Sequence, residues 1–284
     1  MGRGGQGHTL AQVLADGRAE GNAVGAFTAY GIDAAVGIAQ AAERSGSPVM
    51  FLVSGETFSS PFGAALVSAL RTLADAMSVP CVVQLDHVST LEAVREGFAV
   101  GVDAVMADGS RMPFRQNVEF VREAVRIARD HYGAIEAELG RIEGDEDVSN
   151  GAATGRLTDP TEVEDFVRAT GVDCLAVSVG NVHGVYRDVP QIDTELIGVI
   201  AAKARIPLSL HGASGLGATV LREAIARGIG KINFNTELRV AYFEALAACG
   251  KEYERGARLQ QLAVRISERV AVTVEEKLAI LTGR

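Results

Sequence analysis

The sequence predicts an α/β protein, a single (β/α)8 TIM barrel, and three observations lead to this fold class. Short apolar runs rich in β-branched residues alternate with longer segments whose apolar residues recur at i, i+3, i+4 and i+7, the pattern of a helix lying on a sheet. Eight such strand–helix pairs fit the length of about 250 residues that is typical of a closed barrel. The expected strands are apolar throughout, as parallel strands buried on both faces are.

An open doubly wound sheet is the alternative architecture. Such a sheet typically carries a glycine-rich phosphate-binding turn after its first strand. Here the first expected strand runs into Thr28-Ala29-Tyr30-Gly31, which lacks that pattern. The closed barrel is therefore preferred.

The elements are assigned in chain order from the same patterns. The expected strands are Val24–Ala29, Val49–Val53, Cys81–Leu85, Ala104–Met106, Ile135–Leu139, Cys174–Val179, Pro207–Leu210 and Lys231–Phe234. The helices expected between them are Asp33–Arg44, Pro61–Met77, Leu91–Val100, Phe114–His131, Glu162–Thr170, Thr194–Ala204 and Thr219–Arg227. We expect one domain over 1–284.

Three further helices are expected outside the repeating units. A helix over 9–20 is expected to close the bottom of the barrel, and Thr236–Ala248 is expected to follow the last strand. A final helix over Tyr253–Leu281 belongs to a C-terminal helical extension, about 250–284, that a barrel does not need. This extension is a candidate contact in a homodimer or homotetramer.

Composition excludes several classes of protein. The chain is 48% hydrophobic and 22% charged, so it is expected to bury a full core rather than to be disordered. A net charge of −9 argues against a nucleic-acid partner. No apolar run approaches the roughly 20 residues of a membrane span, and the first residues lack the apolar core of a signal peptide. Three scattered cysteines do not form a disulfide framework, and we expect a cytoplasmic protein.

Three of the five histidines directly follow expected strands: His87, His183 and His211 come after the third, sixth and seventh. Because the carboxyl ends of barrel strands share one rim, we expect these side chains to converge. A single histidine at a strand end is more often a hydrogen-bonded structural residue, but three at one rim favour a shared site. Three neutral imidazoles suit Zn²⁺ with an open fourth position. The spacing alone does not distinguish a Lewis acid that polarises a carbonyl from an ion that activates water.

Carboxylates surround the same rim. Asp86 precedes His87, Asp108 follows the fourth strand, and Glu138 ends the fifth. Most acids at such positions are solvated or cap helices. Asp86 and Glu138 are favoured here because an apolar strand holds an acid only for a partner or a task. The long connection Gly140–Asp159 contains more acids, and a loop of this length in a barrel is usually a lid or a binding loop.

Glycines and small polar residues cluster after the last three strands, in Val182–Gly184, His211–Gly215 and Asn233–Thr236. Backbone N–H groups after strands seven and eight form the usual phosphate site of a barrel. From the residues alone, we therefore expect a metal-dependent barrel enzyme that acts on a small phosphorylated carbonyl compound.

Seven stretches, in this order, resemble one known family. They are Leu85–His87, Ala107–Ser110, Glu136–Gly140, Leu157–Pro160, Gly180–Tyr186, Leu210–Gly215 and Lys231–Leu238. The chain is similar to the class II, zinc-dependent ketose-bisphosphate aldolases, which include fructose- and tagatose-bisphosphate aldolases. The ending Thr236-Glu237-Leu238-Arg239 is nearer to the tagatose-type branch.

The resemblance implies a role for each matching residue. It makes His87, His183 and His211 the ligands of one zinc ion, and it makes Asp86 the acid/base at the C4 hydroxyl of the ketose. Glu138 and Asp108 match acids near the metal, in some members at a second metal position. Glu146 matches the acid that moves the proton at C3 of dihydroxyacetone phosphate. The residues that match substrate-binding segments, in part with a Na⁺ or K⁺ ion nearby, are Ser54, Gly184, Gly212, Ala213, Ser214, Asn233, Phe234, Asn235 and Thr236.

One geometric condition attaches to Asp86 and His87. Adjacent side chains of a strand face opposite sides. Both residues can serve one site only if the third strand ends between them, which we expect at the barrel rim.

Departures from the family pattern leave the substrate open. Thr28 stands where many relatives have Asn, and Val88 follows the metal motif where Gly or His is commoner. These positions lie where the aldehyde half of the substrate is expected, so the aldehyde product need not be glyceraldehyde 3-phosphate. A different keto-sugar phosphate, such as a deoxy-keto-gluconate phosphate or a sulfonated sugar phosphate, is one alternative.

Three other classes of protein are alternatives for the same residues. A Schiff-base aldolase needs a lysine at the carboxyl end of a strand, whereas Lys231 is expected to start its strand. A non-catalytic, sugar-phosphate-binding partner subunit would be expected to have lost part of the metal set, which is intact here. A metal-dependent hydrolase fits the chemistry alone, but the resemblance does not support it.

Overall fold

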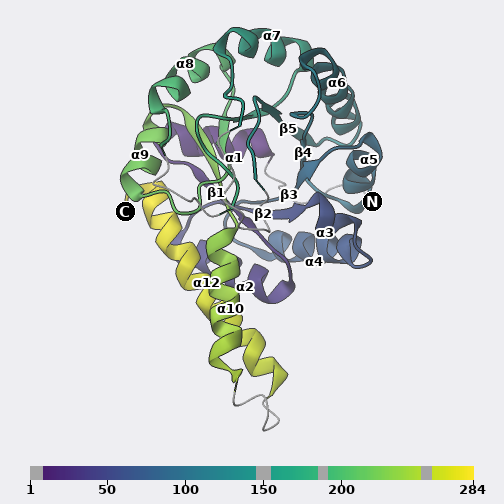
Figure 1. Ribbon diagram of the computed structural model, residues 1–284. Helices are drawn as coiled ribbons and strands as arrows, with labels where there is room; N and C mark the ends of the chain where they lie inside the picture. Colours follow the sequence, from purple (N-terminus) through teal and green to yellow (C-terminus); the bar gives the residue numbers. More distant parts are fainter. Residues whose placement is uncertain (1–8, 145–154, 185–190, 251–257) are drawn as a thin grey trace.

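Eight parallel strands form a closed barrel in the computed structural model, which describes residues 9–144, 155–184, 191–250 and 258–284 (Figure 1). The strands are β1 Val24–Thr28, β2 Val49–Ser54, β3 Cys81–Val88, β4 Ala104–Ala107, β5 Ala134–Leu139, β6 Cys174–Val177, β7 Leu208–Leu210 and β8 Ile229–Phe234. Each strand pairs with the next in the chain, and β8 pairs with β1. The predicted (β/α)8 fold is confirmed.

Helices surround the barrel, as Figure 1 shows. They are α1 Leu10–Ala19, α2 Ile32–Ser45, α3 Gly55–Ser59, α4 Gly63–Ala76, α5 Leu91–Val100, α6 Phe114–Asp130, α7 Pro160–Thr170, α8 Thr194–Ala204, α9 Ala218–Ala226, α10 Thr236–Ala248 and α12 Leu259–Thr282. Their buried faces pack on the outside of the strands, where Phe27, Phe51 and Phe166 belong to one large apolar core. Among the described residues, no helix has the length and apolar character needed to cross a membrane.

The bottom of the barrel is closed by α1. Thr9 caps this helix in a reciprocal pair with Gln12, which satisfies donors at the helix start. The side chains of Leu10 and Leu14 are fully buried and join a second apolar cluster with inward-facing residues such as Met50. Access to the barrel interior is therefore from the opposite end, where the strands terminate at their carboxyl ends.

The interior changes from apolar to polar along the barrel axis. Inward positions alternate along each strand, so Val82 in the inner apolar cluster is followed on the same side by Gln84 and then by Asp86. The same spacing puts Glu136 and Glu138 of β5 in the interior, where both side chains are buried. The open end of the barrel is consequently lined by buried polar groups.

Several element boundaries differ from the sequence prediction. Ser54 caps α3, a short helix that was not expected, by accepting a hydrogen bond from the backbone of Thr57 at 3.1 Å. β6 ends at Val177, two residues before its expected end. β8 begins at Ile229, so Lys231 is not the first residue of its strand. The last described helix begins at Leu259, and 251–257 of the expected extension lie outside the described residues.

The last two described helices form an arm that extends away from the barrel (Figure 1). The arm packs closely on α2, where a Cβ atom at Gly37 would lie 2.4 Å from the carbonyl oxygen of Ser267. Only glycine fits this contact. Large apolar side chains of α10 and α12 are exposed, namely Val240, Phe243, Leu246, Leu259, Val264 and Val272.

Candidate metal centre

Three histidines from separate parts of the chain meet at the open end of the barrel. His87 lies in β3, His183 in the segment after β6, and His211 directly after β7. The ring centroid of His87 lies 4.9 Å from that of His183 and 5.1 Å from that of His211. One nitrogen from each ring lies within 4.8 Å of the others, close enough to hold one metal ion. The structure thus brings together the three side chains that the sequence placed at one rim.

β3 does not end between Asp86 and His87, contrary to the sequence prediction. The strand continues to Val88, and its pairing with β4 shifts register between Leu85 and Val88. His87 has a φ of 50°, in the left-handed region that side chains rarely adopt. This β-bulge re-aims one side chain, so two adjacent residues serve the same side of the strand.

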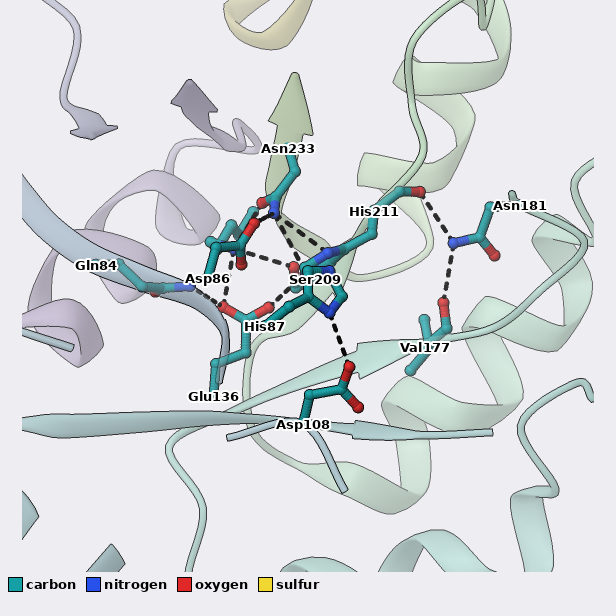
Figure 2. Close-up of polar contacts among 11 residues, drawn as sticks. Gln84, Asp86, His87, Asp108, Glu136, Val177, Asn181, Ser209, His211 and Asn233 are labelled. Carbon is teal, nitrogen blue, oxygen red and sulfur yellow. Dashed lines mark hydrogen bonds and ion pairs between the residues drawn. The ribbon is translucent and has the colours of Figure 1, made fainter. Parts of the chain in front are cut away.

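Asp108 orients the ring of His87. Nδ1 of His87 lies 2.9 Å from a carboxylate oxygen of Asp108, a contact visible in Figure 2. Burial favours the protonated acid, but hydrogen bonds from His87 and Ser110 hold the pKa of Asp108 well below its usual value. With Nδ1 committed to a carboxylate, a metal on His87 would be held through Nε2. Carboxylate–imidazole pairs of this kind fix metal-binding histidines.

His183 is kept neutral by its surroundings. Burial, and then the neighbouring rings of His87 and His211, lower the pKa of this imidazole well below its usual value. Its backbone N–H donates to the carbonyl of Glu143 at 2.9 Å, which joins the segment after β6 to the one after β5. A neutral imidazole is the form that binds metal.

His211 is completely buried and held from two sides. Its Nε2 lies 2.8 Å from Oε1 of Glu136, and its backbone carbonyl accepts from the side-chain amide of Asn181 at 2.9 Å. The supporting residues Glu136, Lys231 and Asn181 were not anticipated as site residues. Glu136 could have been identified from the sequence, because it is an acid within an apolar strand, as Glu138 is.

Glu136 is part of a buried ion pair. Its other carboxylate oxygen lies 2.8 Å from Nζ of Lys231, and both side chains have no exposed surface. Burial alone would neutralise both groups. The lysine, and then His211, hold the pKa of Glu136 well below its usual value, and the carboxylate in turn raises the pKa of Lys231.

Asp86 lies beside the histidines and is almost fully buried. Its Oδ2 accepts a hydrogen bond from the side-chain amide of Asn233 at 3.2 Å, and Figure 2 shows Asn233 between Asp86 and His211. Within the described part of the chain, Oδ1 of Asp86 has no hydrogen-bond partner. One oxygen is therefore fixed by the protein, and the other is available to a ligand.

A second group of donors shares His87 with the first. Ligand atoms of His87, Asp108 and Glu138 also lie within 4.8 Å of one another. Glu138 accepts from the backbone of Ile142 through Oε1, and its buried Oε2 has no partner among the described residues. Burial, and then the charge of Asp108, raise the pKa of Glu138 to about 7. A cation would remove the cost of charging this carboxyl group.

These donors fit a divalent transition metal. The three imidazoles match the ligand set of a catalytic zinc site, in which three protein ligands leave one position for substrate. The unpartnered carboxylate oxygen of Glu138 supplies a further oxygen donor beside them. The sequence profile of class-II fructose-bisphosphate aldolases matches residues 8–283. The chain belongs to this family.

Solved structures of aldolases resemble this family member over nearly its whole length. The YdjI aldolase from Escherichia coli K12 is 28% identical, with a TM-score of 0.84 and coverage of 96% of each chain. A candidate fructose-1,6-biphosphate aldolase from Coccidioides immitis is 30% identical, with a TM-score of 0.86 and coverage of 95% of this chain and 94% of the other. The fructose-bisphosphate aldolase (Fba) from Campylobacter jejuni shares the fold at 20% identity, with a TM-score of 0.79 over 96% of this chain and 93% of that one.

The class-II aldolase resemblance also assigned substrate-binding segments, and most of them lie around the metal centre. Gly212 directly follows His211 and has a φ of 60°; a Cβ atom there would lie 2.1 Å from the carbonyl oxygen of Val182. This contact brings the segment Gly212–Ser214 against the segment that ends at Gly184. Ser214 is buried.

The segment Asn233–Thr236 leads from β8 into α10. Asn235 accepts a hydrogen bond from the hydroxyl of Tyr30 at 3.0 Å, and Thr236 opens the helix. The ring of Phe234 stacks on Phe27 in the outer core, with centroids 5.5 Å apart. Any contact of Phe234 with substrate is therefore through its backbone.

A pocket of about 340 Å³ opens beside α10. It is lined mainly by aromatic and apolar side chains, and Thr28, Tyr30 and Arg239 contribute polar atoms. The hydroxyl of Thr28 is buried and has no hydrogen-bond partner within the described ranges. Ser54, for which a contact with substrate stays a prediction, caps α3 with its hydroxyl. Glu146 and the centre of the expected lid, 145–154, lie outside the described residues.

Proposed function

We propose that this protein is a zinc-dependent aldolase that cleaves and forms a carbon–carbon bond of a ketose phosphate, with dihydroxyacetone phosphate as one product. The observation that carries the proposal is the meeting of three imidazoles, two of them buried, beside a buried aspartate at the open end of the barrel. Family membership supports aldol chemistry at this site.

His87, His183 and His211 would hold the zinc ion, with Asp108 and Glu138 beside them. Zinc, when bound, supplies a Lewis acid for the carbonyl of the ketose. The protein contributes the orientation of the ligands: Asp108 fixes His87, and Glu136 fixes His211. Burial of His183 and His211 keeps water away from that side of the site.

Asp86 moves the proton of the hydroxyl at C4 of the ketose. In cleavage it accepts that proton as the C3–C4 bond breaks, and in condensation it returns the proton. Asn233 holds Oδ2, so Oδ1 is the oxygen that faces the hydroxyl. Glu146, outside the described residues, is proposed to move the proton at C3 of dihydroxyacetone phosphate, as the resemblance implies.

The phosphate of dihydroxyacetone phosphate is proposed to bind after strands seven and eight. Gly184, Gly212–Ser214 and Asn233–Thr236 surround this region. Two helices, α9 and α10, begin here, and helix N-termini favour anions. A Na⁺ or K⁺ ion near the phosphate is part of the proposal.

The aldehyde half is proposed to lie toward β1, over the pocket that Thr28 and Tyr30 line. The pocket has the size of a small-ligand site and mostly apolar walls. Glyceraldehyde 3-phosphate is the reference aldehyde. A deoxy-keto-gluconate phosphate or a sulfonated sugar phosphate remains the alternative substrate, because Thr28 departs from the family pattern. The end of the last matching motif, Thr236–Arg239, supports a place in the tagatose-type branch of the family.

We also propose a homodimer or homotetramer in the cytoplasm. The exposed apolar side chains of the arm formed by α10 and α12 support self-association. All three cysteines are buried free thiols, which supports a reducing compartment.

Metal analysis combined with a coupled cleavage assay tests the proposal. The purified protein is assayed on fructose and tagatose 1,6-bisphosphates before chelation, after chelation, and after zinc is restored. We expect about one zinc per chain and release of dihydroxyacetone phosphate that chelation abolishes and zinc restores. Zinc without cleavage of either sugar would redirect the search to other ketose phosphates. Absence of metal binding would overturn the proposal in favour of a non-catalytic, sugar-phosphate-binding subunit.

A further inference from the structure

The buried ion pair beneath the histidines contacts two different parts of the proposed machinery. Glu136 and Lys231 lie one inward position below Glu138 and Asn233 on their strands, and both are completely buried. A buried pair of charges is costly to form and is often replaceable by apolar residues without loss of stability. Its presence here therefore calls for a role in the site rather than in the core.

Glu136 determines which nitrogen of His211 can bind a metal. An ionised carboxylate accepts hydrogen bonds and does not donate them, so Nε2 of His211, 2.8 Å from Oε1, carries the proton. Asn233 does not make this choice, because its amide nitrogen lies 3.2 Å from Nδ1 and 3.4 Å from Nε2. The lone pair of the ring is therefore on Nδ1.

Lys231 determines how the amide of Asn233 is turned. An ammonium group only donates, and Nζ of Lys231 lies 2.6 Å from Oδ1 of Asn233. The oxygen end of the amide therefore faces the lysine. The nitrogen end then points to Oδ2 of Asp86, 3.2 Å away.

We infer that Glu136 and Lys231 are positioning residues that couple the metal ligand His211 to the acid/base Asp86 through one buried ion pair. Glu136 presents Nδ1 of His211 to the metal, and Lys231 holds Asp86 through Asn233. This inference rests on the proposed function, since it assigns the two residues to a metal centre and a proton-transfer group.

A double variant and a matched control variant separate a positioning role from a role in folding. Glu136→Gln removes the charge but leaves the lysine unpaired, which can unfold the chain. The double variant Glu136→Gln/Lys231→Met removes both charges at nearly constant volume and avoids an unpaired buried ion. Gln84→Met is the matched control: Gln84 is equally buried and donates to Glu136 at 2.9 Å, but its hydrogen bond reaches neither His211 nor Asp86.

The direct readout is the ¹⁵N spectrum of the histidines in metal-free protein, with the His211 signals assigned from a His211→Gln sample. In the wild-type protein and in Gln84→Met we expect a single tautomer, with the proton on Nε2. In the double variant we expect a mixture of tautomers, because the amide at position 136 offers both a donor and an acceptor. A wild-type proton on Nδ1, or an unchanged tautomer in the double variant, would overturn the inference.

Zinc affinity and turnover provide the second readout. Removal of such supporting groups typically weakens metal binding roughly 10–100-fold, and we expect this loss in the double variant but not in Gln84→Met. With zinc saturating, we expect a fall in kcat larger than the change in KM, because Asp86 has lost its fixed orientation. Equal zinc affinity in all proteins, with only lower thermal stability, would show a structural role and contradict the inference. Failure of the wild-type protein to bind zinc would instead overturn the proposed function, while the tautomer measurement would still test the role of Glu136.

Discussion

The side-chain amide of Asn233 donates to Oδ2 of Asp86 at 3.2 Å, so β8 holds a carboxylate that belongs to β3. The two strands lie apart in the barrel order, and the contact crosses the interior. Asp86 is therefore oriented by a residue 147 positions away along the chain. The second oxygen of Asp86 has no partner among the described residues, and we propose that it faces the substrate.

Asp86→Ala is expected to lower the rate of aldol cleavage strongly while zinc remains bound. The reason is that the proposed function assigns proton transfer to Asp86 and metal binding to the histidines. Loss of a general acid/base costs roughly 10²–10⁴-fold in rate. Cleavage kinetics and zinc content of the same preparation check this. Loss of zinc together with activity would show that Asp86 is needed for the metal and not for the proton.

His211→Ala is expected to abolish zinc binding and cleavage together, because it removes one of the three proposed ligands and takes the hydrogen-bond donor from Oε1 of Glu136. His131→Ala is the control, since His131 lies at the end of α6, exposed and away from the other histidines. Zinc content by elemental analysis and cleavage rate are compared. Full activity of the His211 variant without metal would contradict the metal centre.

Glu138 is expected to contribute less to the stability of the metal-free protein as the pH rises toward neutrality. Glu138 has a pKa raised from 4.5 to about 7 by burial and then by Asp108. Between these values the folded chain binds a proton at Glu138 that the unfolded chain has lost, so the contribution of this group to the free energy of unfolding falls by roughly 3 kcal/mol over this range. The stabilisation that comes from neutral Glu138 is fully present only below the pKa of 4.5 that the unfolded chain has.

Glu138→Gln removes this titration. The difference between variant and wild type in the free energy of unfolding is therefore expected to grow, in favour of the variant, from pH 5 to pH 8. Urea unfolding of the metal-free proteins at both pH values measures it. The same difference at both pH values would mean that Glu138 titrates as an ordinary acid.

Gly212→Ala is expected to destabilise the protein and weaken zinc binding. The residue has a φ of 60°, and the added methyl group would meet the carbonyl oxygen of Val182. Strain of this kind costs roughly 1–3 kcal/mol, and relief requires His211 or the segment before His183 to move. Thermal unfolding and zinc titration are the measurements.

Gly198→Ala is the control for this substitution. Gly198 lies within α8, and a Cβ atom there would be in ordinary contact with Arg227. Alanine in a helix interior is expected to stabilise the protein by about 1 kcal/mol. Zinc affinity should be unchanged by it. If the two alanine variants had the same thermal stability and zinc affinity, the positive φ and the close contact at Gly212 would not matter for the metal site.

The fold and the histidine convergence could be predicted because both depend on patterns that repeat along the chain. Apolar runs mark strands buried on both faces, and parallel strands bring their carboxyl ends to one rim. The convergence of His87, His183 and His211 could be predicted from their positions after these strands alone.

The bulge at His87 could not be predicted in the same way. No local sequence signal marks a positive φ at a residue other than glycine, and the register shift that produces it depends on the neighbouring strand β4. The prediction that β3 ends after Asp86 was wrong for this reason. α3 was missed because it has only five residues, too few to show a helical period.

The ion pair of Glu136 and Lys231 could be found only once the register of the barrel strands was known. The two residues are 95 positions apart in a chain whose strands β5 and β8 are not neighbours. An acid and a base inside apolar strands are each visible in the sequence, but their pairing follows only from closure of the barrel. The same holds for the contact of Asn233 with Asp86.

We propose that one zinc ion lies between His87, His183 and His211 in the active protein. Anomalous diffraction from crystals of zinc-loaded, cleavage-competent protein, recorded above and below the zinc edge, locates the ion directly. We expect a single strong peak within about 2.1 Å of a nitrogen of each histidine, and no such peak in His183→Ala crystals. A peak elsewhere in the chain, or an active protein whose three histidines lack one, would contradict it.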